Sequence, residues 1–514
     1  NRTRVTGTGG QQECQSLLLA ITILPGSPLK KPLPTMDNAM KRSPITPLSL
    51  LLATLAAGGA QAADLTNVAN AAWDYDGTWR ADRQTWEADQ ETLVQGRAAL
   101  LPTIDASHRH SEINQTYEST GDLEIDGRSR STSVTLTQPL FRLDAFYGYK
   151  EAKSLTSVAQ AEFYQARQDF VLRVAQGYFG VLRAWDTLVS AQAEEKAISR
   201  QLEQSQERFD VGLVASTDVE EARAAYDLAR VNLIVAEQEF DIARDQLATL
   251  TGRKWETLAE LRDDLPMEGP QPSKMNAWID KAAYQNPQIL AARYSAKAAG
   301  FTADRQLGAM LPKVQLFAEY QHNHNTDPSV SGGDPGNQLT QFYSTQPDTN
   351  SKTIGIEVTV PLFRGGGLNS QRKQAALLAD AAGQRYQQTI RDISQQARTF
   401  YRTVEADALR VEARRQAIRS TRSALEATQS GYEVGTRNVV DVLNAQQALY
   451  AAQRDYANAR YDYILDTLTL KSAAGELDVE DLVAVNEWLS DQETLDLYNP
   501  DLEGQSEEQM VTPR

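Results

Sequence analysis

The chain has 514 residues and a formal net charge of -17 at pH 7. Such an excess of negative charge repels phosphate backbones, so the composition argues against a nucleic-acid partner. Its single cysteine is Cys14. Because this residue precedes the segment that we expect to be cleaved, we exclude disulfide and thiol chemistry from the mature protein.

Residues 40–62 have the order of parts typical of a secretory signal peptide. Basic residues come first, an apolar stretch follows, and Ala60-Gln61-Ala62 supplies the small residues of a cleavage site. A buried helix is the alternative interpretation. We expect the upstream segment, 1–39, to be absent from the mature protein, with Met36 and Met40 both open as the start of translation. No later stretch approaches the ~18 apolar residues that a spanning helix needs, so we expect an exported protein that does not cross a membrane as helices.

The mature chain begins with a helical pattern and then changes to a period of two residues. Residues 65–100 are helical in pattern, and Leu101-Pro102 ends the helix. Apolar and polar residues then alternate over 103–110 and, after a polar stretch that ends near Ser129, over 133–137. This pattern predicts two strands joined by an exposed loop.

The second half of the chain repeats this pattern more clearly. Residues alternate over 314–321 and 354–360, with a polar loop over about 325–350. Alternating segments of about ten residues separated by long polar loops are typical of outer-membrane β-strands. A soluble antiparallel sheet is the alternative.

Each strand pair is followed by an unusually long helix. The pattern predicts helices over about 145–210 and 369–433, and return helices over about 217–251 and 439–474. Each long helix would extend ~98 Å at about 1.5 Å per residue. Both mix Ala with Gln, Arg, Glu and Leu, as coiled-coil helices do. We expect them to pack laterally, because an isolated helix this polar would not be stable.

The turns between these helices show that the chain contains an internal repeat. Val211-Gly212-Leu213 in the first hairpin corresponds to Val434-Gly435-Thr436 in the second, 223 positions later. The Gly in each tip can adopt a positive φ and end the helix, and Asn438 is an N-cap candidate for the next helix. The junctions Pro139-Leu140-Phe141-Arg142 and Pro361-Leu362-Phe363-Arg364 correspond in the same way.

The repeat predicts the organisation of the mature chain. We expect a first repeat over 63–253, a linker over 254–272, a second repeat over 273–477, and an acidic tail over 478–514 whose end is disordered. Two strands per repeat give four strands per chain, which cannot close a barrel, and an open edge is not tolerated in lipid. The chain must therefore oligomerise around a shared barrel, and counting alone leaves a dimer with eight strands and a trimer with twelve open.

The chain resembles the TolC family of outer-membrane efflux and secretion channels. The residues that carry the resemblance are the two tips, the block Val440-Asp441-Val442-Leu443 and the two Pro-Leu-Phe junctions. The resemblance covers about 65–477. It implies a homotrimer with one 12-stranded membrane β-barrel and a long α-helical coiled-coil barrel, in the outer membrane of a Gram-negative bacterium and extending into the periplasm. It also implies a passive exit duct that works with a periplasmic adaptor protein and an inner-membrane pump of the ABC or RND type.

The resemblance also assigns roles to individual residues. It implies a periplasmic gate in which Tyr432 and Arg437 of the second hairpin bond to Thr217 and Asp218 of the first. It implies a constriction formed by acidic rings, of which Asp441 supplies one and Asn444 supplies an amide in place of the second carboxylate. The hairpin tips are then the expected contact with the adaptor, since they lie at the far periplasmic end.

Two of these residues have simpler explanations that can coexist with the implied roles. Asp441 can be a solvated helix residue, and Asp218 can belong to the start of a helix formed by Ser216-Thr217-Asp218. Phe141 and Phe363, next to Pro139 and Pro361, are expected as membrane-interface anchors, with core packing as the alternative.

No catalytic set or cofactor-binding motif is found in the sequence, so we predict neither an enzyme nor a bound cofactor. Gly365-Gly366-Gly367 lacks the Lys-Ser/Thr of a phosphate-binding loop. The pairs His108/His110 and His322/His324 are conceivable metal ligands, but their place late in the strands favours a polar girdle near the outer leaflet. The alternative to an exit duct is a periplasmic coiled-coil scaffold or adhesin without a pore, and the cargo, a small compound or a secreted protein, stays open.

Overall fold

The computed structural model describes residues 63–117, 123–265, 267–331 and 348–498. The predicted signal peptide and its upstream segment, and the end of the acidic tail, lie outside these ranges. Within them, no helix carries an apolar stretch sufficient to cross a bilayer.

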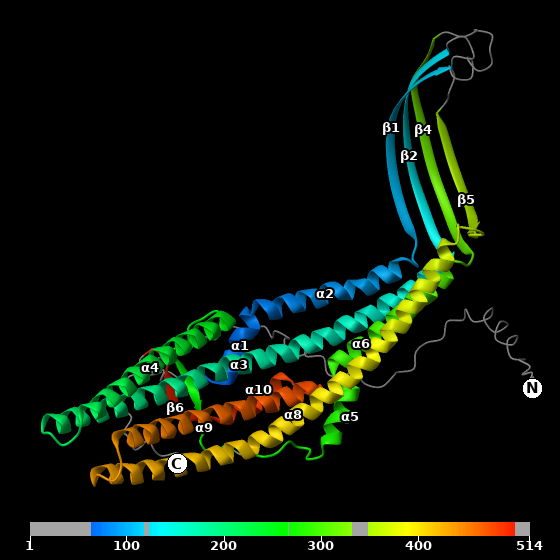
Figure 1. Cartoon of the computed structure of the whole chain (residues 1–514). Helices are drawn as coiled ribbons and strands as arrows, with labels where there is room; N and C mark the ends of the chain where they lie inside the picture. The colour runs from blue at the N-terminus through cyan, green and yellow to red at the C-terminus, as the bar shows by residue number, and fades with distance from the viewer. Residues whose placement is uncertain (1–62, 118–122, 266, 332–347, 499–514) are drawn as a thin grey trace, which may run out of the picture. The chain divides into compact units, whose positions relative to one another are not determined.

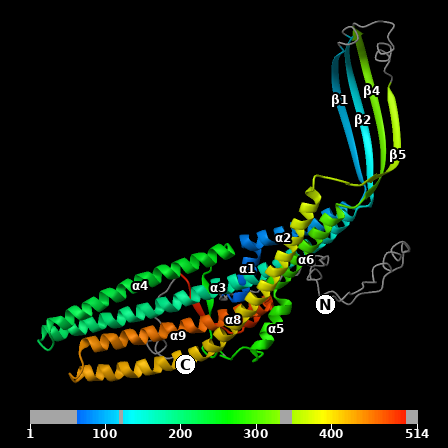
Figure 2. The same ribbon diagram turned by 45° about the vertical axis from the view of Figure 1, so that its right-hand side comes forward.

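The two halves of the chain have the same order of elements, as the tandem repeat predicts (Figure 1). The first half contains α1 (Leu65–Tyr75), α2 (Gly77–Ala98), β1 (Thr103–Tyr117), β2 (Leu123–Phe141), α3 (Leu143–Asp210) and α4 (Ser216–Thr251). The second half contains α5 (Met275–Gln285), α6 (Pro287–Gly308), β4 (Lys313–Ser331), β5 (Thr349–Thr359), α8 (Gly367–Glu433) and α9 (Val439–Ala474). The long helices α3 and α8 have 68 and 67 residues. They form the hairpins α3–α4 and α8–α9, which lie side by side in both views (Figures 1 and 2).

The predicted linker and the predicted acidic tail contain regular structure that the sequence analysis did not assign. The predicted linker, 254–272, contains β3 (Thr257–Leu261), and the predicted acidic tail contains α10 (Val479–Asn486) and β6 (Leu489–Asp496). The strands β3 and β6 pair antiparallel, with Leu258 opposite Leu495 and both side chains buried. The prediction was incomplete here because the partners are far apart in sequence and each strand is short.

The helix expected over 65–100 is broken at Asp76. One carboxylate oxygen of this buried residue caps α2 by accepting from the backbone of Thr78 at 3.0 Å. The other accepts two hydrogen bonds from Arg173 of α3, at 3.1 and 2.6 Å. Asn286 caps α6 in the same way at the matching point of the second repeat. The break thus serves to cap the second helix and to fix it to its neighbour.

The four long strands form one antiparallel sheet in the order β1-β2-β4-β5, so that β1 and β5 are its edges. The strands extend further than predicted, into the polar stretches that we expected to be loops. Ile104, Leu136, Ala318 and Ile354 form one row across the sheet, and this face is apolar and exposed. Because side chains alternate, the opposite face carries polar groups such as Glu357.

The sheet joins the helices through a compact ionic junction. Asp144, at the start of α3, contacts Arg142 at 2.9 Å and Lys313 of β4 at 2.7 Å. Burial raises the pKa of Asp144, but the hydrogen bonds from Arg142 and Lys313 outweigh it and hold the pKa well below its usual range. A Cβ at Gly308 of α6 would lie 2.8 Å from the backbone nitrogen of Asp144. Only glycine therefore permits α6 to pack this closely against α3.

Candidate gate at the hairpin tips

Both hairpins end in the same turn. Gly212 and Gly435 adopt φ values of +77° and +78°, where L side chains are strained. The next residue donates its backbone N–H back into the helix, from Leu213 to Arg208 O and from Thr436 to Gly431 O, each at 2.8 Å. These are the bonds expected for a helix that ends in a left-handed glycine.

The tips present apolar side chains to solvent. Val211, Leu213 and Val434 are 70%, 74% and 75% exposed. Three exposed aliphatic side chains on two neighbouring turns form an unusual surface for a soluble region, since such patches commonly mark protein contacts.

The four predicted gate residues lie near these tips, but among the described residues no hydrogen bond or ion pair joins Tyr432 or Arg437 to Thr217 or Asp218 within one protomer. Arg437 Nη1 lies 3.8 Å from Oδ2 of Asp441, one turn along the same helix. Oδ1 of Asp218 accepts from the hydroxyl of Thr217 at 3.4 Å. Tyr432 is buried, with the guanidinium of Arg208 4.7 Å from its ring centre, and its hydroxyl has no hydrogen-bond partner among the described residues.

The two predicted constriction residues differ in their surroundings. Asp441 forms a capping box with Asn438, because each side chain accepts a hydrogen bond from the other residue's backbone nitrogen. Asn444 is exposed. Asn438 is thus the N-cap that the sequence predicts, and Asp441 has a structural role in addition to any role in a pore.

Near the tips, the contact between the hairpins is apolar and contains unpaired polar atoms. Ile198 of α3 packs with Tyr432, Val439, Val442 and Leu443 of the second hairpin. Four buried side-chain atoms on these helices have no hydrogen-bond partner among the described residues: Gln201 Nε2, Ser205 Oγ, Tyr432 hydroxyl and Gln446 Oε1. An unpaired buried polar group costs about 1–3 kcal/mol. We call the contact between the two hairpins the seam, and its part near the tips is therefore weak.

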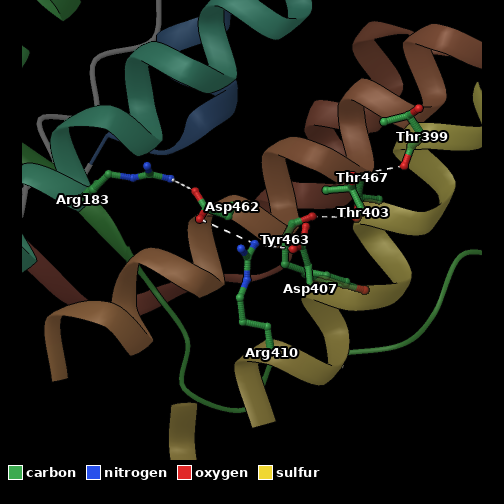
Figure 3. Close-up of polar contacts among 8 residues, drawn as sticks. All are labelled: Arg183, Thr399, Thr403, Asp407, Arg410, Asp462, Tyr463 and Thr467. Atoms are coloured by element: carbon green, nitrogen blue, oxygen red, sulfur yellow. Dashed lines mark hydrogen bonds and ion pairs between the residues drawn. The ribbon is translucent and has the colours of Figure 1, made fainter. Parts of the chain in front are cut away.

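Further from the tips, the same seam is held by charged hydrogen bonds. Asp462 of α9 lies between Arg183 of α3, at 2.5 Å, and Arg410 of α8, at 3.8 Å (Figure 3). The hydroxyl of Tyr461 donates to Asp186 of α3 at 2.6 Å. The helical period could not reveal these pairs, because it does not show which helices meet.

A buried carboxyl group, that of Asp407, lies beside this charged cluster and has the carboxyl group of Asp466 as a neighbour. Asp407 of α8 is 1% exposed, and its Oδ2 has no hydrogen-bond partner among the described residues. Burial, and next the neighbouring carboxyl of Asp466, raise the pKa of Asp407 to about 7, against the opposing effect of Arg410. A protonated Asp407 can donate to a neighbouring carboxyl oxygen, which turns a repulsive contact into a hydrogen bond.

The junction phenylalanines are exposed in the protomer. Phe141 ends β2 next to a strand irregularity at Pro139, and Phe363 follows Pro361 after β5. Their exposed fractions, 50% and 85%, rule out core packing within one protomer. Their role as interface anchors stays a prediction.

The histidine pairs lie on the apolar side of the sheet, near the middle of β1 and β4. The expected place late in the strands was wrong, because both strands continue beyond the histidines, to Tyr117 and Ser331. His108 Nδ1 lies 2.9 Å from Thr132 Oγ1, and His322 Nδ1 lies 2.8 Å from Asn350 Oδ1. In the part of the chain that the structure describes, no three His, Cys, Asp or Glu side chains are grouped as metal ligands.

Comparison with known proteins decides which family this architecture represents. The family model described as outer membrane efflux protein matches residues 79–253 and 278–476, which include both hairpins and all four long strands. The chain belongs to this family. The family confirms the resemblance to TolC, the fold class of a β-barrel with a helical barrel, and the location in the outer membrane.

Curated relatives cover most of the chain. TolC of Escherichia coli is 33% identical over 412 residues, which are 80% of this chain and 81% of TolC. The alkaline protease secretion protein AprF of Pseudomonas aeruginosa is 30% identical over 422 residues, 80% of this chain and 85% of AprF. Among solved structures, the CmeC channel of Campylobacter jejuni matches with a TM-score of 0.66 at 18% identity, over 82% of this chain and 89% of CmeC. The chain is therefore an outer-membrane channel protein and not an enzyme.

Proposed function

We propose that three copies of this chain form one passive exit duct from the periplasm to the exterior. The observation that carries the proposal is the four-stranded sheet, which has one exposed apolar face and two edges, β1 and β5. In lipid, each unsatisfied backbone group at an open edge costs several kcal/mol. Three sheets joined edge to edge give a closed barrel of twelve strands with no free edge.

The helices offer a second surface for the same assembly. Leu228, Val231, Val235 and Ile242 of α4 are about half exposed and recur at intervals of three, four and seven residues. Such spacing is typical of a helix that packs along another helix. We assign this stripe to the contact with the neighbouring protomer in the helical barrel.

The gate and the constriction belong to this trimer. Tyr432 and Arg437 are proposed to bond to Thr217 and Asp218 across the seam, and the unpaired hydroxyl of Tyr432 supports this, because it leaves a buried donor available. The rings of Asp441 and Asn444 are then formed by three-fold symmetry.

The duct is proposed to receive its cargo from an inner-membrane pump through a periplasmic adaptor that docks on the tips. The tips are suited to this contact because Val211, Leu213 and Val434 are exposed at the ends of the hairpins. The relatives include both a protease secretion protein and an efflux protein, BepC of Brucella suis. A passive duct accepts either class of cargo, so the pump determines what is exported.

The test is the stoichiometry and conductance of protein purified from outer membranes. Native mass spectrometry should give three chains per particle, and planar bilayers should show discrete channels. Val231→Asp with Val235→Asp should abolish the trimer, whereas Arg230→Asp, at an exposed position beside the stripe, should not. A dimer, or particles without conductance, would refute the proposal.

A further inference from the structure

The apolar face of the sheet ends in two rows of polar and basic side chains. One row contains His108, Thr132, His322 and Asn350, and the next contains His110, Arg130, His324 and Asp348. Lys352 lies in the row below, opposite Tyr320. We define the outer belt as the basic side chains of these rows: His108, His110, Arg130, His322, His324 and Lys352. By the alternation of the strands, the belt faces the same way as Ile104 and Ile354.

The position of the belt along the strands corresponds to a membrane interface. Phe141, at the junction with the helices, lies opposite Val314, and His324 follows Val314 by about ten residues on β4. At about 3.3 Å per residue this span is ~33 Å along the strand, or ~25 Å in height at a tilt of about 40°. The apolar band of an outer-membrane barrel is about 25 Å tall. If Phe141 marks the periplasmic interface, the belt lies at the outer one.

The belt is basic in a chain that is otherwise strongly acidic. Among the described residues of these three rows, Asp348 is the single carboxylate, and it lies 2.8 Å from His324. One row further out, Glu112 pairs with Arg128 at 3.8 Å. Because Arg130 and Lys352 carry two positive charges against the one negative charge of Asp348, the net charge of these rows is positive. The net charge of the whole chain is -17, so this local sign is not a consequence of composition.

An apolar depression lies directly below the belt. It has a volume of about 360 Å³. Its lining residues are Val134, Leu136, Ala318, Glu319, Tyr320, Lys352, Thr353 and Ile354. Lys352 thus lies both in the lining and in the belt. A ligand with an apolar chain and a phosphate group matches this arrangement, because the chain can occupy the depression while the phosphate meets Lys352 and Arg130.

We propose that the outer belt binds phosphate groups of anionic lipids in the outer leaflet, with an acyl chain of the same lipid in the depression below. Arginine suits this ligand because its fork of N–H donors matches phosphate oxygens. The lipid source is favoured over free phosphate because the apolar and basic parts of the site are continuous on one face. The proposal adds a specific lipid contact to the general apolar surface of the barrel.

The chain supplies a matched control for the experiment. Arg109 lies between His108 and His110 at the same height, but on the opposite face of the sheet. Arg109→Gln therefore removes the same charge as Arg130→Gln without changing the belt. Arg130→Lys with Lys352→Arg keeps both charges and serves as the conservative variant.

The test is native mass spectrometry of purified full-length protein with diphosphorylated lipid A, with phosphatidylethanolamine for comparison. Wild-type protein should retain lipid A through detergent exchange and should not retain phosphatidylethanolamine. Arg130→Gln should lower retention, and Arg130→Gln with Lys352→Gln should lower it by about tenfold or more, since each basic side chain near a membrane surface contributes measurably to anionic-lipid binding. Arg109→Gln and the charge-conserving variant should retain lipid as the wild type does.

Three outcomes would overturn the proposal. Equal loss in Arg109→Gln would show that overall charge, not the belt, controls retention. Undiminished retention in Arg130→Gln with Lys352→Gln would show that the lipid binds elsewhere. Full displacement by inorganic phosphate would show that the site takes free phosphate rather than a lipid. Circular dichroism and the oligomeric state of every variant confirm that each one is folded.

Discussion

The buried side chain of Asp407 allows a prediction about stability, because its surroundings determine both the sign and the size of the effect. Replacing Asp407 by asparagine removes a group that the fold prefers to keep protonated. Its surroundings explain the preference: the side chain is buried, Asp466 is another carboxyl group, and the opposing attraction of Arg410 is the smaller effect. Asparagine has nearly the same shape and stays neutral at every pH.

The folded state binds the proton of Asp407 more tightly than the unfolded chain does, since the pKa rises from 3.8 to about 7. This contribution to stability is fully present below about pH 4 and is lost as the pH rises to about 7. Between pH 5 and pH 8, the linkage relation gives a loss of roughly 2–3 kcal/mol per protomer as an upper limit.

The assay is thermal unfolding of the helices, followed by circular dichroism at pH 5 and pH 8. Asp407→Asn should raise the melting temperature more at pH 8 than at pH 5, since part of the contribution of Asp407 is already lost at pH 5. The control is Asp455→Asn. Asp455 forms a half-exposed ion pair with Arg414, which also joins α8 and α9, so the variant removes one carboxylate from the same pair of helices. The control should change stability slightly and equally at both pH values. A larger destabilisation of Asp407→Asn at pH 8 than at pH 5 would show that Arg410 stabilises an ionised Asp407, and would refute the reasoning.

Three further predictions concern the tips. Tyr432→Phe with Arg437→Ser should give a stable oligomer whose conductance rises severalfold, because each gate link contributes only about 1 kcal/mol; wild-type conductance would place the gate elsewhere. Asp441→Asn should weaken block by divalent cations and Asn444→Asp should strengthen it, since a ring of carboxylates attracts cations. Single-channel recordings in which neither variant alters the block would show that neither residue lines the pore. Val434→Asp should abolish export while the oligomer remains in the membrane, and loss of the oligomer would contradict a docking role.

The sequence predicted those parts of the fold that depend on local pattern. The start of α3 was predicted within two residues and its end at Asp210, because the helix contains no proline and ends at Gly212. The capping role of Asn438 and the matching turns of the two tips also follow from local chemistry. The family resemblance then supplied the roles of the gate residues, which no local pattern contains.

The parts that were missed depend on contacts between distant residues. The pairing of β3 with β6 joins segments separated by more than two hundred residues, and neither is long enough to be distinctive alone. The bonds from Arg183 to Asp462 and from Tyr461 to Asp186 depend on which faces of two hairpins meet.

In the proposed gate, the difference between the two parts of the seam would let the tips separate while the rest of the helical barrel stays closed. When the tips part, water can satisfy the unpaired groups of Gln201, Ser205 and Gln446, which offsets the apolar contact that is lost. Nearer the sheet, separation breaks the charged bonds of Asp462 and Asp186 instead. We therefore expect hydrogen exchange to be faster over 198–210 and 432–446 than over 178–190 and 456–470 in the intact oligomer. Equal protection of the two regions would mean that the unpaired groups do not weaken the tip contact, and that the hairpins open as rigid units along their whole length.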